Sequence, residues 1–599
     1  MDIHPTVAQV ARNIVSRSKE SRNRYLKTVE QQQVKGKARA SLACGNLAHT
    51  IAASEDHEKT SILDFTKVNL AIVTAYNDMV SAHQPYFFYP EMIKKTLSEL
   101  GNSAQVAGGI PAMCDGITQG NDGMELSLFS RDLIAQATAL SLSHNTYDGT
   151  LLLGVCDKIA PGQLIGALSF GHLPTAFVPS GPMATGISND QKTSVRQKFV
   201  AGEADRTELQ AMECQAYHSS GTCTFFGTAN TNQLVLEAMG LMLPGSAFVP
   251  PDSLLREKLT EKVTQHIAAV SNTNNSSKSL AKVVDEKSVV NGLVALMAAG
   301  GSTNHTIHLI AVAKAAGWII NWDDLDALSE VVPLLVKMYP NGSADINDFQ
   351  RAGGVPALMN NLHQRRLIFM DANPVYGSME NYLTTPVIGE NQSLTFQETE
   401  CSLDLNVISD SKNSFRATGG LKLLKGNLGK GIMKVSAVAK EHQRVSAPAR
   451  VFDSQHDVET AYKMGKFTED AVIVVRYNGP AANGMPELHK LMPIMGNLMK
   501  QGLNVALVTD GRLSGASGKV PAVIHITPEA KRGGLLAKIA DGDLIQVDGI
   551  SGTIDVLQDI SQRSESIPAL KDSYYGSGRE LFNVFRQAVS SADTGATIL

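Results

Sequence analysis

The chain has 599 residues, 43% of them hydrophobic and 19% charged, with a formal net charge of -5. Its length is too great for one hydrophobic core, so we expect at least two domains, and its slight negative charge disfavours nucleic acid and membrane surfaces as partners, which leaves small molecules. No segment reaches the roughly 18 apolar residues of a membrane span, and the N-terminus lacks the apolar core of a signal peptide, so we expect a cytoplasmic protein.

Strand and helix patterns alternate in the first part of the chain. Residues 68–76 ("VNLAIVTAY") have the pattern of a strand, and residues 123–144 have helical periodicity ahead of a second strand at residues 149–155. A further strand, at residues 174–181, follows one helix later. This alternation predicts an α/β fold in which the N-terminal domain, residues 1–385, is a doubly wound parallel sheet with helices on both faces.

Short strands separated by turns rich in Gly, Asn and Asp dominate the chain after about residue 385. Five of them are predicted, at residues 450–454, 470–477, 504–511, 542–549 and 552–557. One strong helix, at residues 486–502, interrupts the strands. We therefore predict a C-terminal, strand-rich, β-barrel-like domain over residues 386–599, with a few helices packed on it.

A thiol, an acid and a base stand together where a buried strand is expected to end. Cys156, Asp157 and Lys158 follow the strand of residues 149–155, and ligands of open α/β sheets bind at the carboxyl ends of the strands. A structural interpretation stays open for this triplet, namely a buried cysteine, a helix-capping aspartate and a solvated lysine.

Two other loops carry cysteines among small residues. Cys114 and Asp115 lie in a Gly-rich turn, and Cys223 lies in a second loop ahead of a helix. Thiolates suit iron–sulfur clusters or zinc, whereas carboxylates suit Mg²⁺. The six cysteines include no Cys-x-x-Cys pair, which disfavours a zinc ribbon and a ferredoxin-type cluster but permits a cluster held by separate loops.

Several segments resemble the signature sequences of the dihydroxy-acid and phosphogluconate dehydratase family. In chain order they include "CDGITQGNDGMELSL", "CDKIAPG", "GTCTFFGTANTNQL", "MAAGGSTNHTIHL" and "TDGRLSGASG", and the resemblance covers about residues 65–560. It implies a hydro-lyase that uses an iron–sulfur cluster, 4Fe-4S rather than 2Fe-2S, and Mg²⁺ as cofactors. It also implies a homodimer.

Three segments resemble the branch of this family that acts on phosphogluconate, namely "TAYNDMVSAHQPY", "GALSFGHLP" and "YHSSGTCTF". This resemblance implies the conversion of 6-phospho-D-gluconate to 2-dehydro-3-deoxy-6-phospho-D-gluconate and water, a step of the Entner–Doudoroff pathway. A dihydroxy-acid or a non-phosphorylated sugar acid stays open as the substrate, because either would use the same metal site.

The resemblance also implies roles for individual residues. Cys156 and Cys223 match the family's cluster-ligating cysteines, and Ser514 matches its catalytic base. The positions that match its magnesium ligands are Asp115, Asp157, Lys158 and Glu487. The family's lysine can be carbamylated, which would make Lys158 an anionic ligand, and Lys158 is also the next candidate for the base.

One position departs from the pattern of a dihydroxy-acid dehydratase subgroup. Where that subgroup has a third ligating cysteine in a Pro-Cys-Asn motif, this chain has Ser81, Ala82 and His83. We take Cys114 as the first candidate for the third ligand and His83 as the second. The alternatives are a buried loop cysteine and a histidine that bonds a backbone carbonyl. We expect only structural roles for Cys44, Cys214 and Cys401.

The dehydration reaction explains why these residue types are needed. A weakly acidic proton must leave C2, beside the carboxylate, while hydroxide leaves C3, so a Lewis acid that polarises the leaving oxygen and stabilises the enolate is required. Ser514 can act as a base if Mg²⁺ lowers the pKa of its hydroxyl. The alternative is a turn serine that bonds its own backbone.

The sequence leaves two other classes of function open. Residues 423–434 carry glycines and lysines like a nucleotide-binding loop, although they lack the spacing of a P-loop. An electron-transfer iron–sulfur protein is the other class, and the carboxylates of the Mg²⁺ type disfavour it.

Overall fold

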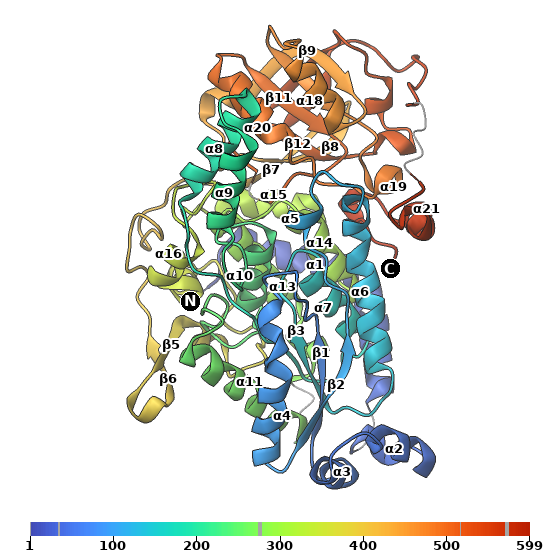
Figure 1. Cartoon of the computed structure of the whole chain (residues 1–599), viewed down its shortest axis with the longest axis vertical. Helices are drawn as coiled ribbons and strands as arrows, with labels where there is room; N and C mark the ends of the chain where they lie inside the picture. The colour runs from blue at the N-terminus through green and yellow to red at the C-terminus, as the bar shows by residue number, and fades with distance from the viewer. Residues whose placement is uncertain (1, 34–35, 273–277, 516, 569–573) are drawn as a thin grey trace.

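The computed structural model describes residues 2–33, 36–272, 278–515, 517–568 and 574–599. The molecule is elongated, with the N-terminal sheet towards one end and the C-terminal strands at the other (Figure 1). The first helix, α1 (Pro5–Gln32), packs against α13 (Glu286–Ala299) and α15 (Trp322–Val331). Within the described residues, no helix is both long enough and apolar enough to span a membrane.

A four-stranded parallel sheet organises the N-terminal part, so the predicted α/β fold class is confirmed. The strand order is β2 (Ser103–Gly109), β1 (Asn69–Thr74), β3 (Gly149–Leu153) and β4 (Thr175–Phe177). Strands β1 and β3 are buried along their whole length, which is why their sequences are continuous apolar runs. The sequence pattern misses β2 because it is a partly exposed edge strand built of small residues.

Helices cover both faces of this sheet. On one face α4 (Tyr89–Glu99) packs with α11 (Leu254–Asn272), and on the other α6 (Met124–Leu142) packs with α7 (Ile159–Leu168) (Figure 1). Helix α7 can come close to α6 because Gly162 has no side chain. A Cβ at this position would lie only 2.5 Å from a backbone carbonyl oxygen of α6. This contact fixes the start of α7, and therefore the residues between β3 and α7.

Further described helices complete the layers around the sheet, and α10 and α14 among them are almost wholly buried. They are α2 (Cys44–Ile51), α3 (Asp56–Leu63), α5 (Asp115–Thr118), α8 (Asn189–Ala201), α9 (Arg206–Ala216), α10 (Thr228–Ala238), α12 (Leu280–Val283), α14 (His305–Ala315), α16 (Ile346–Arg351) and α17 (Gly354–Gln364).

Eight strands form a closed barrel in the C-terminal part, which confirms the predicted barrel-like fold. Residues Val472 and Val474 of one strand belong to the core inside the barrel, whereas Ile473 and Val475 belong to a second core under the outer helices. The order of strands around the barrel is β10 (Ala471–Val475), β11 (Val505–Thr509), β12 (Ala522–Thr527), β8 (Gly429–Lys434), β7 (Leu421–Gly426), β14 (Thr553–Val556), β13 (Leu544–Asp548) and β9 (Arg444–Phe452).

The sequence pattern predicts five of these strands and misses β7, β8 and β12. Strands β7 and β8 pair antiparallel from Leu421 to Lys434, with glycines and lysines at positions where apolar residues would signal a strand. The segment 423–434 is therefore a β-hairpin. It is not the strand–loop–helix unit that a nucleotide-binding P-loop requires.

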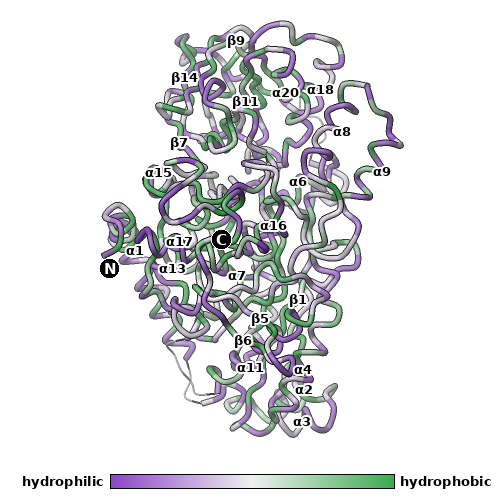
Figure 2. The backbone as a smooth tube through the Cα atoms, turned by 90° about the vertical axis from the view of Figure 1, so that its left-hand side faces the viewer, coloured by the Kyte–Doolittle hydropathy of each residue, from purple (hydrophilic) through white to green (hydrophobic). Residues whose placement is uncertain are grey.

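Helices α18 (Gln455–Lys463) and α20 (Leu491–Lys500) cover the barrel from outside. The mostly hydrophilic α8–α9 hairpin extends from the N-terminal part to meet α20 (Figures 1 and 2). The side-chain amide of Asn497 donates a 3.3 Å hydrogen bond to the Gln197 carbonyl there.

The division into residues 1–385 and 386–599 stays a prediction. Three shorter elements are β5 (Thr384–Ile388), β6 (Leu394–Glu398) and α19 (Pro480–Asn483).

The end of the chain leaves the barrel and returns to the N-terminal part. Helix α21 (Asn583–Ala588) brings Phe585 against Phe129 of α6, with ring centroids 5.6 Å apart. The last residues then lie against α14. The end of the chain is therefore packed between α14 and the barrel, where Asp593 Oδ2 lies 2.6 Å from Lys430 Nζ of β8.

Candidate metal centre

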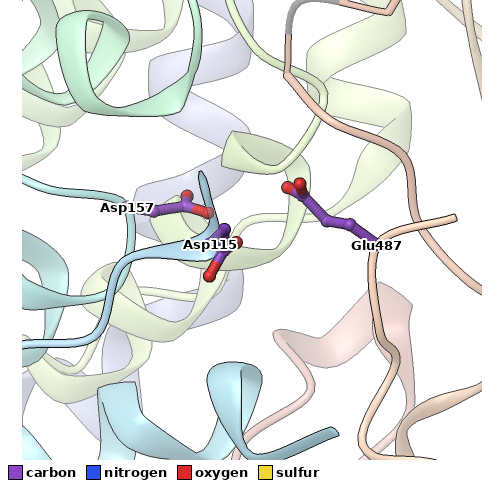
Figure 3. A group of neighbouring side chains, drawn as sticks. All are labelled: Asp115, Asp157 and Glu487. Atoms are coloured by element: carbon purple, nitrogen blue, oxygen red, sulfur yellow. The ribbon is translucent and has the colours of Figure 1, made fainter. Parts of the chain in front are cut away.

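Three buried carboxylates from distant parts of the chain converge. Asp115, Asp157 and Glu487 each offer an oxygen that lies within 4.8 Å of the other two. Asp115 begins α5, Asp157 follows β3, and Glu487 precedes α20, so both the N-terminal and the C-terminal parts contribute (Figure 3). All three are predicted metal ligands, and the structure places them together.

The turn after β3 is tightly packed against α7, and this packing places the residues of the turn beside the carboxylates. A Cβ on Gly154 would lie 2.3 Å from Gln163 Oε1 and 2.7 Å from Ile159 Cγ2, so β3 runs directly into α7. Cys156, Asp157 and Lys158 then occupy the carboxyl edge of the sheet, where ligands of α/β proteins bind.

Two buried cations face the carboxylates. The Lys158 ammonium contacts both Asp115 Oδ2 and Asp157 Oδ2, and its side chain is fully buried. Arg512 Nη1 lies 2.7 Å from Glu487 Oε1, and Arg512 Nη2 lies 3.1 Å from Asp115 Oδ2. With three acids and two bases, the group keeps one unbalanced negative charge if all are ionised.

Burial and these cations shift the carboxyl groups in opposite directions. Burial raises the pKa of Glu487 to about 7, although Arg512 opposes the shift. For Asp157 burial acts in the same sense, but Lys158 and Arg512 outweigh it and hold the pKa of this carboxyl below its ordinary value. Of these two carboxyls, Glu487 therefore takes up a proton more readily than Asp157.

The buried oxygen atoms of this centre without a hydrogen-bond partner in the described part of the chain suit a magnesium ion as ligands. Asp157 Oδ1 and Asn304 Oδ1 are buried oxygens without a hydrogen-bond partner among the described residues, and buried oxygens of this kind need a partner. Asn304 Nδ2 donates to Glu487 Oε1 at 3.3 Å, so the amide oxygen of Asn304 stays beside the group. Carboxylate and amide oxygens are ligands that Mg²⁺ prefers, and these residues therefore fit it.

Three thiols lie next to the carboxylates. Cys114 and Cys156 immediately precede Asp115 and Asp157 in the chain. Burial raises the pKa of Cys156 well above its ordinary value, and the nearby Cys114 and Cys223 thiols add to this. Burial, followed by Cys114, raises the pKa of Cys223 to about 12. These thiols therefore resist ionisation. They lose their protons when they bind a metal, so this group fits an iron–sulfur cluster.

Cys114 lies beside Cys156 and Cys223, but His83 makes a different contact. The His83 ring is buried, and its Nε2 accepts a 3.2 Å hydrogen bond from the Val155 backbone N–H. Burial lowers the pKa of His83 to about 3, which keeps the ring neutral. The other three cysteines lie outside the thiol group: Cys44 in α2 and Cys214 in α9 are exposed, and Cys401 is half-buried after β6.

Ser514 is half-buried in the loop that follows Arg512. A Cβ on the next residue, Gly515, would lie 2.3 Å from Ser302 Oγ, so this loop presses against the N-terminal part. Ser302 precedes Asn304, whose amide reaches Glu487. The structure therefore brings the Ser514 loop beside the carboxylate group.

Four further residues of this centre were not predicted from the sequence, although all of them stand in signature segments. Arg512 stands in "TDGRLSGASG" and Asn304 stands in "GGSTNHTIHL". Gln119 Nε2 donates to Glu487 Oε2 at 3.0 Å, and Ser127 donates to Asp115 Oδ1. Only their place inside a signature segment could have identified them, because Arg, Asn, Gln and Ser carry no metal-ligand spacing of their own.

Two sequence profiles of one family match almost the whole chain. The profile described as "Dihydroxy-acid/6-phosphogluconate dehydratase N-terminal" matches residues 67–381, and the profile described as "Dihydroxy-acid/6-phosphogluconate dehydratase C-terminal" matches residues 406–596. The chain belongs to the dihydroxy-acid/6-phosphogluconate dehydratase family. It is therefore an enzyme of the hydro-lyase class, as the resemblance of its signature segments implies.

Curated relatives are similar along their full length. The phosphogluconate dehydratase of Escherichia coli (strain K12) is 53% identical over 601 residues, which cover 100% of both chains. That of Pseudomonas aeruginosa is 52% identical over 99% of this chain and 98% of its own. A dihydroxy-acid dehydratase of Helicobacter hepaticus is 32% identical over 85% of this chain and 91% of its own.

The raised pKa of Glu487 predicts how pH affects the metal-free enzyme. Its stabilising contribution is complete below the ordinary pKa of 4.5, and it is lost as the pH rises towards 7, where the buried carboxyl must ionise. The free energy of unfolding should therefore fall as the pH rises from 4.5 to 7. This fall should be absent in Glu487→Gln, and Mg²⁺ should offset it in the unmodified enzyme. Denaturant titrations at several pH values measure this, and parallel pH profiles for both proteins would contradict it.

Proposed function

We propose that this dehydratase converts 6-phospho-D-gluconate to 2-dehydro-3-deoxy-6-phospho-D-gluconate and water, as in the Entner–Doudoroff pathway. The observation that supports it most is the pairing of an oxygen-lined group with a thiol group through the consecutive residues Cys156 and Asp157. The full-length relatives named phosphogluconate dehydratase support the choice of substrate. A cytoplasmic location stays a prediction from the N-terminal sequence and the lack of an apolar span, and a homodimer stays a prediction from the resemblance.

The two groups of side chains would hold two cofactors. Asp115, Asp157 and Glu487 would bind Mg²⁺, and Lys158 would join them as an anionic ligand if it is carbamylated. Cys156, Cys223 and Cys114 would bind an iron–sulfur cluster, 4Fe-4S rather than 2Fe-2S. When bound, these cofactors supply Lewis acidity towards the substrate carboxylate and the departing hydroxyl.

The enzyme's own residues would orient the substrate and move the proton. Ser514 removes the proton from C2, and Lys158 is the alternative base. The electron pair left at C2 forms the C2–C3 double bond as hydroxide leaves C3, which gives an enol that tautomerises to the 2-keto product. Arg512 stays in the site as a permanent cation, so it offsets the negative charge that develops next to the carboxylates.

The choice of substrate is tested by comparing 6-phospho-D-gluconate, D-gluconate and a 2,3-dihydroxy acid on the anaerobically purified enzyme. The phosphate adds charge-assisted hydrogen bonds, so we expect kcat/KM for 6-phospho-D-gluconate to exceed that for D-gluconate by at least about a hundredfold. Equal or better turnover of either unphosphorylated substrate would replace the proposed reaction with the alternative dehydration.

Removing single thiols tests the cluster. Cys156→Ser, Cys223→Ser and Cys114→Ser should each lose bound iron and the brown colour of the protein, because a cluster needs every one of its thiolates. Cys214→Ser is the matched control, since this thiol is exposed on α9. Iron and sulfide analysis of each variant checks this, and full iron content in Cys114→Ser would remove Cys114 from the ligand set.

Ser514→Ala tests the base. Turnover should fall by at least about a hundredfold, the usual contribution of a positioned base, while iron content and substrate binding persist. Ser517→Ala, in the same loop, serves as the control. The measurements are the rate and the primary isotope effect with C2-deuterated 6-phospho-D-gluconate. Near-normal turnover with full iron content would leave Lys158 as the base.

A further inference from the structure

We propose that the last residues of the chain belong to the metal centre: residues 596–598 hold Arg131 and Asp132, Arg131 holds His308, and His308 orients Asp157. This makes His308 a positioning residue for a proposed metal ligand. The inference rests on the proposed function in one respect, because it assumes that Asp157 binds Mg²⁺.

The first link joins two atoms that have no other partner. His308 Nε2 lies 3.5 Å from Asp157 Oδ1, and neither atom has a hydrogen bond within the part of the chain that the structure describes. The cations of the centre are directed at the other oxygen, since both Lys158 and Arg512 approach Asp157 Oδ2. His308 is therefore the group that can fix the direction of Oδ1.

The second link determines which nitrogen of His308 carries the proton. Arg131 Nη1 lies 3.1 Å from His308 Nδ1. A guanidinium group can only donate, so Nδ1 accepts, and the proton of the neutral ring is on Nε2. The protonated nitrogen is therefore the one that lies 3.5 Å from Asp157 Oδ1. Arg131 thus gives His308 the tautomer that can orient the carboxylate.

The third link is the C-terminus itself. Arg131 Nη2 donates to the carbonyl oxygen of Ala596 at 2.7 Å, and Arg131 Nε donates to Asp132 Oδ1 at 2.9 Å. The second oxygen of Asp132 accepts from Thr597 Oγ1 at 2.9 Å and from the Ile598 backbone N–H at 2.8 Å. Both side chains at the base of the network are thus held by residues 596–598.

The network is buried and closely packed. Arg131 is 0% exposed, Asp132 and His308 are each 1% exposed, and Thr597 is 3% exposed. Gly595, with φ of +99°, lets the tail lie directly on the helix that carries His308, because a Cβ there would be 2.9 Å from the Ala311 nitrogen. Buried hydrogen bonds of this kind hold a ligand in one orientation, and losing them typically costs 10–100-fold in metal affinity.

The test measures the affinity for Mn²⁺, a spectroscopic substitute for Mg²⁺, by electron paramagnetic resonance of the purified full-length enzyme. We expect about 10–100-fold weaker binding for His308→Leu and for a chain that lacks residues 596–599. His308→Gln keeps an N–H donor and should stay within about threefold of the unmodified enzyme. Thr597→Val, a milder change, should weaken binding severalfold without unfolding the protein.

Lys314→Met is the control. It removes only the exposed contact between Lys314 Nζ and the Leu599 carbonyl oxygen, 2.6 Å long, and should leave Mn²⁺ affinity unchanged. Iron content and thermal unfolding are measured beside it for every variant. A variant that keeps its iron and its unfolding temperature but binds Mn²⁺ weakly supports a positioning role.

The other outcomes separate this inference from the proposed function. If the unmodified enzyme binds Mn²⁺ and turns over 6-phospho-D-gluconate, but His308→Leu and Thr597→Val bind Mn²⁺ normally, the positioning network alone is overturned. If the truncated chain binds Mn²⁺ normally but His308→Leu binds it weakly, the role of the C-terminal residues is overturned. If the unmodified enzyme binds no Mn²⁺, both are overturned. The unmodified enzyme could instead dehydrate an acid other than 6-phospho-D-gluconate. If its variants then bind Mn²⁺ weakly, the network is supported and only the proposed substrate is overturned.

Discussion

The balance between three buried carboxylates and two buried cations is the constraint on which the rest of the structure depends. Two like unit charges 4 Å apart repel by about 4 kcal/mol at an effective dielectric constant of ~20, so Asp115, Asp157 and Glu487 cannot all stay ionised together unless cations or a metal ion accompany them. Lys158 comes from the N-terminal part, while Arg512 and Glu487 come from the C-terminal part. Arg512 and Glu487 meet Lys158 and Asp115 only where the C-terminal part packs against the N-terminal part, so the site needs both parts.

The placement of thiols beside acids follows from local backbone geometry. Cys114 has an extended conformation, with φ of −117° and ψ of 115°, and successive side chains of extended backbone point to opposite sides. The pair Cys114–Asp115 can therefore offer a sulfur to one group and an oxygen to the other. Two adjacent sites of different chemistry suit a reaction that must stabilise charge at C1 and C2 while hydroxide leaves C3.

Strong periodic patterns made the fold predictable where strands are buried. β1, β3, β10 and β11 lie between two apolar layers, so their sequences are runs of Val, Ile, Leu and Ala that stand out from the neighbouring turns. β2, β7 and β8 carry Gly, Ser or Lys where such a run would be expected, because part of each strand is only partly buried or exposed. Only hydrogen bonding to their neighbours makes them strands, and that is a tertiary property.

The sequence by itself determined the fold class, the family, and the identity of the acids and thiols, since these follow from apolar runs and from side chains inside signature segments. Tertiary structure alone decided that Arg512 faces the carboxylates, that His83 accepts from the Val155 backbone, and that the C-terminus reaches Arg131. These contacts join residues up to 465 positions apart. Local sequence carries no signal for such distances, because only the packed chain specifies which donor meets which acceptor.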